Sequence, residues 1–115
     1  LGDAGLKALI AQCSFFVSAS EYEGFGLVLI AAMRAGLLPV VEANEAFGAI
    51  ARKHEIVRTV DYSDSGMAAE ALRLRFVALQ QQPALRKTAV SAASSYGWPA
   101  KARQYEDLYR KVLRF

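Results

Sequence analysis

Cysteine and histidine are almost absent from this 115-residue sequence, which contains one of each. A single cysteine, Cys13, excludes a disulfide bond within the chain. Together with the only histidine, His54, it leaves too few nitrogen and sulfur ligands for a zinc site of the usual kind. We therefore expect no metal ion.

Long apolar runs are missing as well. No stretch approaches the roughly 18 residues that a membrane-spanning helix needs, and the first residues lack the basic and then apolar pattern of a secretory signal. A net charge of +3 is too small to indicate nucleic-acid binding by itself. These absences predict one cytoplasmic domain that binds no nucleic acid.

The sequence does contain an alternation of strand and helix patterns. Short apolar runs predict strands over residues 14–18, 38–41 and 56–60. Helical spacing predicts helices over residues 3–12, 27–34, 44–52 and 66–82, a further helix from Pro83, and a last one at the C-terminal end. This order is typical of a Rossmann-like parallel α/β sheet with flanking helices and a C-terminal helical segment. About three strands are few for such a sheet, so we expect an open edge and only part of a larger sheet.

Two of these elements carry specific expectations about burial. The strand over residues 14–18 is continuously apolar, which is typical of a strand buried on both faces. The inner face of the helix over residues 66–82 is predicted to consist of Ala68, Leu72, Phe76 and Leu79. Arg73, Arg75 and Gln80 are predicted to lie on its other side.

The segment between the first strand and the second helix is the strongest candidate for a binding site. Ligands of open parallel sheets bind beyond the carboxyl ends of the strands, and this segment leads directly into a helix N-terminus. Its glycines allow a phosphate to approach the amides of Gly24, Phe25, Gly26 and Leu27. The carboxylate of Glu23 would instead accept hydrogen bonds from hydroxyl groups. Phosphate beside hydroxyls describes a nucleotide sugar, but a strand, a glycine turn and a helix also occur in α/β proteins purely as a connection.

Residues 23–27, 32–36 and 39–41 resemble the donor-site signature of the family 4 retaining glycosyltransferases, which have the GT-B architecture. The tail is similar too, since Tyr96-Gly97-Trp98 and the later Tyr105 and Tyr109 match the family's closing elements. The resemblance implies that residues 1–115 form a single partial nucleotide-sugar-binding domain, half of a GT-B C-terminal domain. The acceptor-binding N-terminal domain would be absent from this sequence.

The resemblance also assigns roles to individual residues. In that family two glutamates separated by seven residues act at the donor, and the first of them corresponds to Glu23, here the candidate catalytic residue. The implied donor-binding residues are Glu23, Gly24, Phe25, Gly26, Leu27, Val28 and Ala31. The first four would contact the sugar, and the amides of Leu27 and Val28 would face the diphosphate.

Ala31 departs from the family pattern, because it stands where the second glutamate would hold the ribose hydroxyls. Alanine offers no acceptor, so its presence should weaken nucleotide binding by roughly 1.5–3 kcal/mol, or about ten- to a hundredfold. Glu42 and Glu45, beyond the next strand, are the nearest carboxylates that could compensate. A natural loss and an engineered change of this residue are both open on the sequence alone.

The implied activity is transfer of mannose from GDP-mannose to a lipid-linked oligosaccharide in exopolysaccharide synthesis, without a metal cofactor. The doubled Leu37-Leu38 before Pro39 is nearer to bacterial exopolysaccharide mannosyltransferases. The partners would be the nucleotide sugar and, through the missing domain, a lipid-linked or saccharide acceptor. The parent protein would be cytoplasmic or peripheral to the inner face of the membrane.

By itself this chain is expected to be inactive, because the acceptor side and the cationic phosphate grip lie outside it. The alternative is a non-catalytic folding or assembly module. Such a module would pair through its exposed sheet edge with another copy of the chain or with a missing half-domain.

Overall fold

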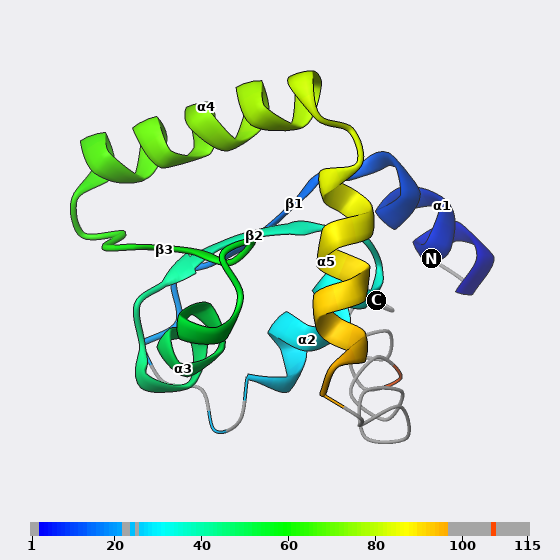
Figure 1. Ribbon diagram of the computed structural model, residues 1–115, viewed down its shortest axis with the longest axis horizontal. Coiled ribbons are helices and arrows are strands. Elements are labelled where there is room, and N and C mark those ends of the chain that lie inside the picture. Colours follow the sequence, from blue (N-terminus) through cyan, green and yellow to red (C-terminus); the bar gives the residue numbers. More distant parts are fainter. Residues whose placement is uncertain (1–2, 22–23, 25, 97–106, 108–115) are drawn as a thin grey trace.

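The computed structural model describes residues 3–21, 24, 26–96 and 107 of the chain. The elements in chain order are α1 (Asp3–Gln12), β1 (Phe15–Ser18), α2 (Leu27–Arg34), β2 (Leu38–Glu42), α3 (Glu45–Lys53), β3 (Arg58–Val60), α4 (Ser65–Gln81) and α5 (Leu85–Ser94), as Figure 1 shows. Within the described residues the strands form one parallel sheet in the order β1-β2-β3. The predicted α/β fold class is therefore confirmed. The C-terminal helix predicted beyond residue 96 lies outside the described residues.

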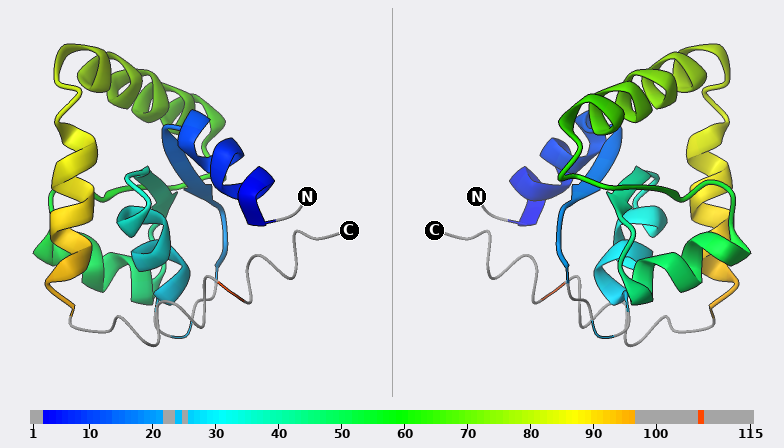
Figure 2. Two further views of the ribbon diagram at one scale, coloured as in Figure 1. Left: turned by 90° about the vertical axis from the view of Figure 1, so that its right-hand side faces the viewer. Right: turned by 90° about the vertical axis from the view of Figure 1, so that its left-hand side faces the viewer.

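Helices cover both faces of the sheet. Figures 1 and 2 show α4 across one face and α2, α3 and α5 on the other. Each face has its own apolar core: Val40 and Val60 pack with α4, whereas Leu38 and Val41 pack with the other three helices. A parallel sheet needs this double cover because both of its faces are apolar.

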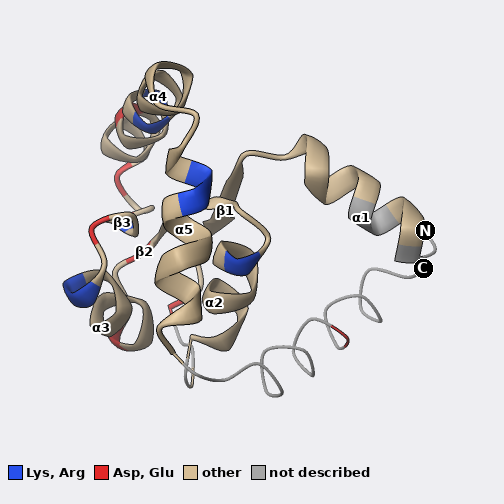
Figure 3. Ribbon diagram, turned by 45° about the vertical axis from the view of Figure 1, so that its right-hand side comes forward, with Lys and Arg blue, Asp and Glu red and all other residues tan. Residues whose placement is uncertain are grey.

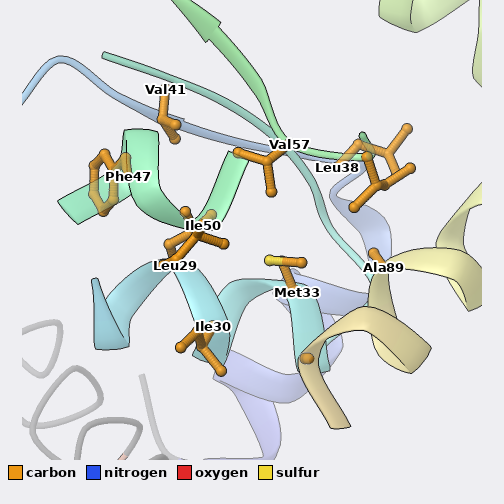
Figure 4. Close-up of a cluster of buried hydrophobic side chains, with 11 residues drawn as sticks. Leu29, Ile30, Met33, Leu38, Val41, Phe47, Ile50, Val57 and Ala89 are labelled. Carbon is orange, nitrogen blue, oxygen red and sulfur yellow. The ribbon is translucent and has the colours of Figure 1, made fainter. Parts of the chain in front are cut away.

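The larger core is built around α2. Leu29 and Met33 of this helix and Phe47 of α3 are fully buried, and Figure 4 shows them converging with Ile50. No residue of α2 is exposed, as its all-round apolar sequence predicts. The helix is followed by Gly36, whose φ of 83° is the left-handed conformation that glycine adopts after a helix end.

One arginine joins α5 to the residues that precede β1. The guanidinium of Arg86 in α5 donates hydrogen bonds of 2.8 Å to the carbonyl oxygen of Cys13 and 2.8 Å to the hydroxyl of Ser14. These two residues immediately precede β1. The first strand is thus fixed in place by a helix that is more than seventy residues away along the chain.

The structure corrects the expectation that the first strand is buried on both faces. Val17 is 49% exposed. The reason lies in the cover of the sheet, because α4 packs against β2 and β3 and leaves β1 without an equivalent partner on that face. The third strand also begins later than predicted, at Arg58, and Ile56 is a buried turn residue that packs into the larger core.

The inner face predicted for α4 is partly wrong. Ala68 is buried against the sheet, but Phe76 is 53% exposed and Arg75 is half-buried instead. At about 100° per residue, Arg75 lies about 20° from Ala68 around the helix axis, whereas Phe76 lies about 80° away. Helix geometry therefore turns Arg75 inward, and the apolar character of Phe76 does not reverse that.

Candidate functional site

The loop between β1 and α2 lies at the carboxyl edge of the sheet, where the sequence places it. β1 ends at Ser18, and the side-chain amide of Asn44, which follows β2, donates a hydrogen bond of 2.8 Å to the carbonyl oxygen of Ser20. Ser18 and Ser20 are also joined, through their hydroxyls, at 3.1 Å. The start of this loop is thus held against the ends of two adjacent strands.

Asn44 connects this loop to α3. Its side-chain oxygen accepts a hydrogen bond of 2.8 Å from the amide of Phe47, which caps the helix N-terminus. The residue is only 9% exposed, and both ends of its side-chain amide are bonded. The sequence predicts a helix that starts at Asn44 but does not predict the second role of this residue, which depends on contact between segments 24 residues apart.

The two glycines of the loop serve different purposes. Gly26 is buried with a φ of 70°, and a Cβ atom there would lie 2.6 Å from Cδ1 of Ile50. Gly24 is exposed and has open space around it. Gly26 is therefore required by the backbone and the packing, whereas Gly24 leaves room beside the main chain. Glu23 and Phe25 lie outside the described residues.

The N-terminus of α2 presents amides rather than side chains. Gly26, its first flanking residue, provides no side-chain cap, and the first turn contains no acidic residue. The carbonyl oxygen of Gly26 accepts hydrogen bonds from Leu29 and Ile30. The amides of Leu27 and Val28 belong to the first turn, where a helix offers no internal acceptor. Such an end attracts anions through its free N–H groups and its dipole.

The structure places Ala31 within α2, partly buried and one turn beyond these amides. The two carboxylates considered as substitutes belong to β2 and α3. Glu42 accepts a hydrogen bond of 2.8 Å from the amide of Tyr62, and its negative charge together with burial raises the pKa of the Tyr62 phenol, with burial the larger cause. Glu45 is exposed in the first turn of α3.

A cavity of about 420 Å³ adjoins the loop. It is lined by Gly24, by one side of α3 including Glu45 and Lys53, and by Tyr96 after α5. Lys53 is a cation near the loop that sequence analysis did not single out. Its position in the last turn of α3 gave no signal, because basic residues are common at helix ends.

The described residues place no three His, Cys, Asp or Glu side chains where they could hold a metal ion together. None of the described helices is long and apolar enough to cross a membrane.

A parallel sheet covered on both faces, with a glycine-led helix start at its carboxyl edge, defines part of a Rossmann-like α/β domain. Residues 2–91 match the family model described as "Glycosyl transferases group 1". The chain therefore belongs to this family of glycosyltransferases, and the resemblance found in the sequence is confirmed at that level.

The curated relatives include mannosyltransferases with two kinds of acceptor in their names. The chain is 33% identical over 112 residues to a GDP-mannose:cellobiosyl-diphosphopolyprenol alpha-mannosyltransferase of Komagataeibacter xylinus, covering 96% of this chain and 28% of the relative. It is 31% identical over 109 residues to the protein of that name in Xanthomonas oryzae pv. oryzae (strain PXO99A), covering 94% and 29%. A phosphatidyl-myo-inositol mannosyltransferase of Mycobacterium leprae (strain TN) is 32% identical over 115 residues, covering 96% and 30%.

The chain thus spans less than a third of the length of these relatives. No solved structure matches it significantly.

Proposed function

We propose that the chain is the donor-binding part of a retaining glycosyltransferase that transfers mannose from GDP-mannose to a lipid-linked oligosaccharide in exopolysaccharide synthesis. The N-terminus of α2 carries this proposal: it lies at the carboxyl edge, has no side-chain cap and is entered through Gly26. The names of the relatives support GDP-mannose as the donor and a lipid diphosphate as the acceptor.

In this proposal Glu23 and the amides of Gly24, Phe25 and Gly26 hold the sugar. The amides of Leu27 and Val28 face the diphosphate, so that negative charge on the departing nucleoside diphosphate meets the positive end of α2. The loop acts by positioning the donor and by electrostatic stabilisation, and no metal ion takes part. Ala31 lies at the ribose position and contributes no hydrogen bond there.

The remaining functions belong to the rest of the enzyme. Residues 1–115 form a partial domain, and the acceptor, whether lipid-linked or saccharide, binds to a separate domain. The parent protein is cytoplasmic, peripheral to the inner face of the membrane. The isolated chain binds donor weakly and transfers no sugar.

Calorimetric titration of the chain with GDP-mannose, UDP-glucose and GDP tests the proposal. GDP-mannose should bind more tightly than UDP-glucose, and Ala31→Glu should raise the affinity for GDP by about ten- to a hundredfold, because it supplies a charged acceptor for the ribose. Unchanged affinity in Ala31→Glu would contradict the ribose assignment.

A second pair of variants tests Glu23 in the same titrations. Glu23→Ala should weaken GDP-mannose and leave GDP unchanged, because its proposed contact is with the hexose. Glu21→Ala is the matched control, since Glu21 is an exposed carboxylate two residues away in the same loop. An equal loss in both variants, or none in Glu23→Ala, would reject the sugar contact.

The assembly module is a second candidate, favoured by the position of β1 at one edge of the sheet, where its only partner among the described strands is β2. In this case the open edge of β1 would pair with a second copy or a missing half-domain. Light scattering distinguishes the two, since a chain that stays monomeric at high concentration contradicts pairing with itself.

A further inference from the structure

A second cavity, of about 620 Å³, lies between α3 and β3. It is bounded by α3, by β3 and by the side chain of Arg75 from α4. None of the proposed donor-binding residues lines it. Its lining includes three arginines, Arg52, Arg58 and Arg75, and two glutamates, Glu45 and Glu55. Figure 3 shows the basic end of α3 beside the β3 segment.

Two of the arginines, Arg58 and Arg75, line the same cavity. Arg75 is half-buried, and its guanidinium donates a hydrogen bond of 3.0 Å to the carbonyl oxygen of Glu55, which fixes its direction. Burial lowers the pKa of Arg75, and the positive charge of Arg58 lowers it further. Both groups stay charged at neutral pH, so the fold holds two like charges on one cavity.

Arg52 adds a third cation on the same side. Its Nη1 lies 3.8 Å from the position that a Cβ atom of Gly48 would occupy, so the guanidinium lies along α3 next to that glycine. A cation in the last turn of α3 interacts favourably with the helix dipole, so the position of Arg52 is explained even without a bound ligand. The same explanation does not apply to Arg58 or Arg75.

Neither glutamate forms an ion pair with these cations. Among the described residues, Arg73 and Glu70 of α4 form an ion pair at 2.6 Å. No ion pair joins an arginine of the cavity to a carboxylate in this part of the chain. Glu55 contributes its carbonyl oxygen, and Glu45 lies at the opposite end of α3 from Arg52. The guanidinium groups are therefore left for an anion that comes from outside the described residues.

We propose that this cavity binds a phosphoryl group, carried either by a soluble phosphate compound or by a lipid headgroup. Guanidinium groups match phosphate oxygens through paired hydrogen bonds, and a doubly charged anion balances the closely spaced arginines better than a carboxylate does. None of the proposed donor-binding residues lines the site, and its existence does not require the proposed transferase activity.

The test is a titration of the ¹⁵N-labelled chain with inorganic phosphate, with pyrophosphate, and with phosphatidylcholine vesicles with or without phosphatidic acid. Saturable shifts of the Gly48 and Thr59 amides report this cavity, whereas shifts at Gly26 report the donor loop. Arg58→Ala should weaken the response at Gly48 and Thr59 by about tenfold or more, because it removes a charged hydrogen-bond donor.

Arg73→Ala is the matched control, since Arg73 is on α4 but outside the cavity. It should leave the affinity unchanged. Arg58 is exposed, so its replacement should preserve the fold; Arg58→Gln replaces the alanine variant if the dispersed amide spectrum is lost.

The outcomes separate the two sources of the ligand. A response to phosphate or pyrophosphate alone assigns a soluble phosphate compound, and a response that needs phosphatidic acid assigns a lipid headgroup. The proposal is overturned if no probe gives a saturable response at Gly48 and Thr59, or if Arg73→Ala weakens it as much as the Arg58 variant does. Glu23→Ala and Ala31→Glu should not alter this response, which keeps it separate from the donor experiment.

Discussion

The N-termini of α2 and α3 lie near each other but are built in opposite ways. α3 begins with Asn44, whose side chain accepts the Phe47 amide, and has Glu45 in its first turn. α2 begins with Gly26 and has neither a side-chain cap nor an acidic residue. A cap contributes typically about 1 kcal/mol, so α2 depends on its buried side chains instead. The start of α3 is thus capped by a side chain of the chain itself, whereas Gly26 supplies no such cap to α2.

The largest loss of stability is expected from replacing Phe47, whose side chain lies between the two helix starts. Phe47 is fully buried in α3, and its Cδ1 would lie 3.7 Å from a Cβ atom on Gly26. Phe47→Ala should lower the free energy of unfolding by about 3–5 kcal/mol, because it leaves a cavity in the core. Urea denaturation measures this loss. Leu74→Ala on the 51% exposed Leu74 is the control, and a similar loss there would contradict the assignment of the core.

Replacement of the two loop glycines distinguishes the one that the backbone and the packing require from the one that they do not. Gly26→Ala should cost about 1–3 kcal/mol of unfolding free energy, since alanine is strained at this positive φ and its Cβ meets Ile50. Gly24→Ala should stay within about 0.5 kcal/mol because nothing surrounds the added atom. Thermal denaturation of both variants checks the difference, and equal stabilities would refute it.

Two substitutions of Asn44 separate the contributions of its two side-chain hydrogen bonds to stability. Asn44→Ala should lower the free energy of unfolding by about 1–2 kcal/mol, because the cap of α3 is lost. Asn44→Asp keeps an acceptor for Phe47 but removes the donor to Ser20, so it should be the more stable variant. In the complete enzyme it should still raise KM for the donor. An Asp variant as unstable as the Ala variant would show that the bond to Ser20 matters more than the cap.

The smallest expected effect is the pH dependence of the stability contributed by Tyr62, which follows β3. The phenol of Tyr62 donates to the carbonyl oxygen of Val40, and its raised pKa means that the folded state holds the proton more tightly than the unfolded state. This stabilisation is complete below the usual tyrosine pKa of about 10 and is lost as the pH rises through the higher folded value. The stability difference between wild type and Tyr62→Phe should therefore stay constant up to about pH 9 and shrink as the pH rises above about 10. A constant difference in urea denaturation would contradict this.

Local pattern was sufficient to predict the elements that hold the site. The apolar spacing predicts α1 over Asp3–Gln12 and α2 over Leu27–Arg34 with the bounds that the structure shows. Asn44 marks the start of α3, and Gly36 marks the end of α2. Both are predictable because helix capping is decided by residues that are neighbours in the sequence. The assignment of the glycosyltransferase family likewise rests on contiguous residues.

The features that sequence reasoning missed depend on segments far apart in the chain. The bond from Asn44 to Ser20 exists only once β1 and β2 lie side by side. The apolar neighbours of Val17 predict that it is buried, but its burial depends on where α4 packs. Arg75 was predicted on the outer side because it is charged, although its carbonyl partner and the helix geometry turn it inward.

The tie between Arg86 and residues Cys13 and Ser14 has a consequence for biosynthesis. At the usual rate of about 5–20 residues per second, roughly 4–15 s pass between translation of Cys13 and of Arg86. During that interval the nascent chain can pair β1 with β2, but the leading end of β1 has no guanidinium to hold it. The leading end of β1 thus gains its guanidinium contact only after the start of α5 has been synthesised, and release of the chain before residue 86 would leave that end without it.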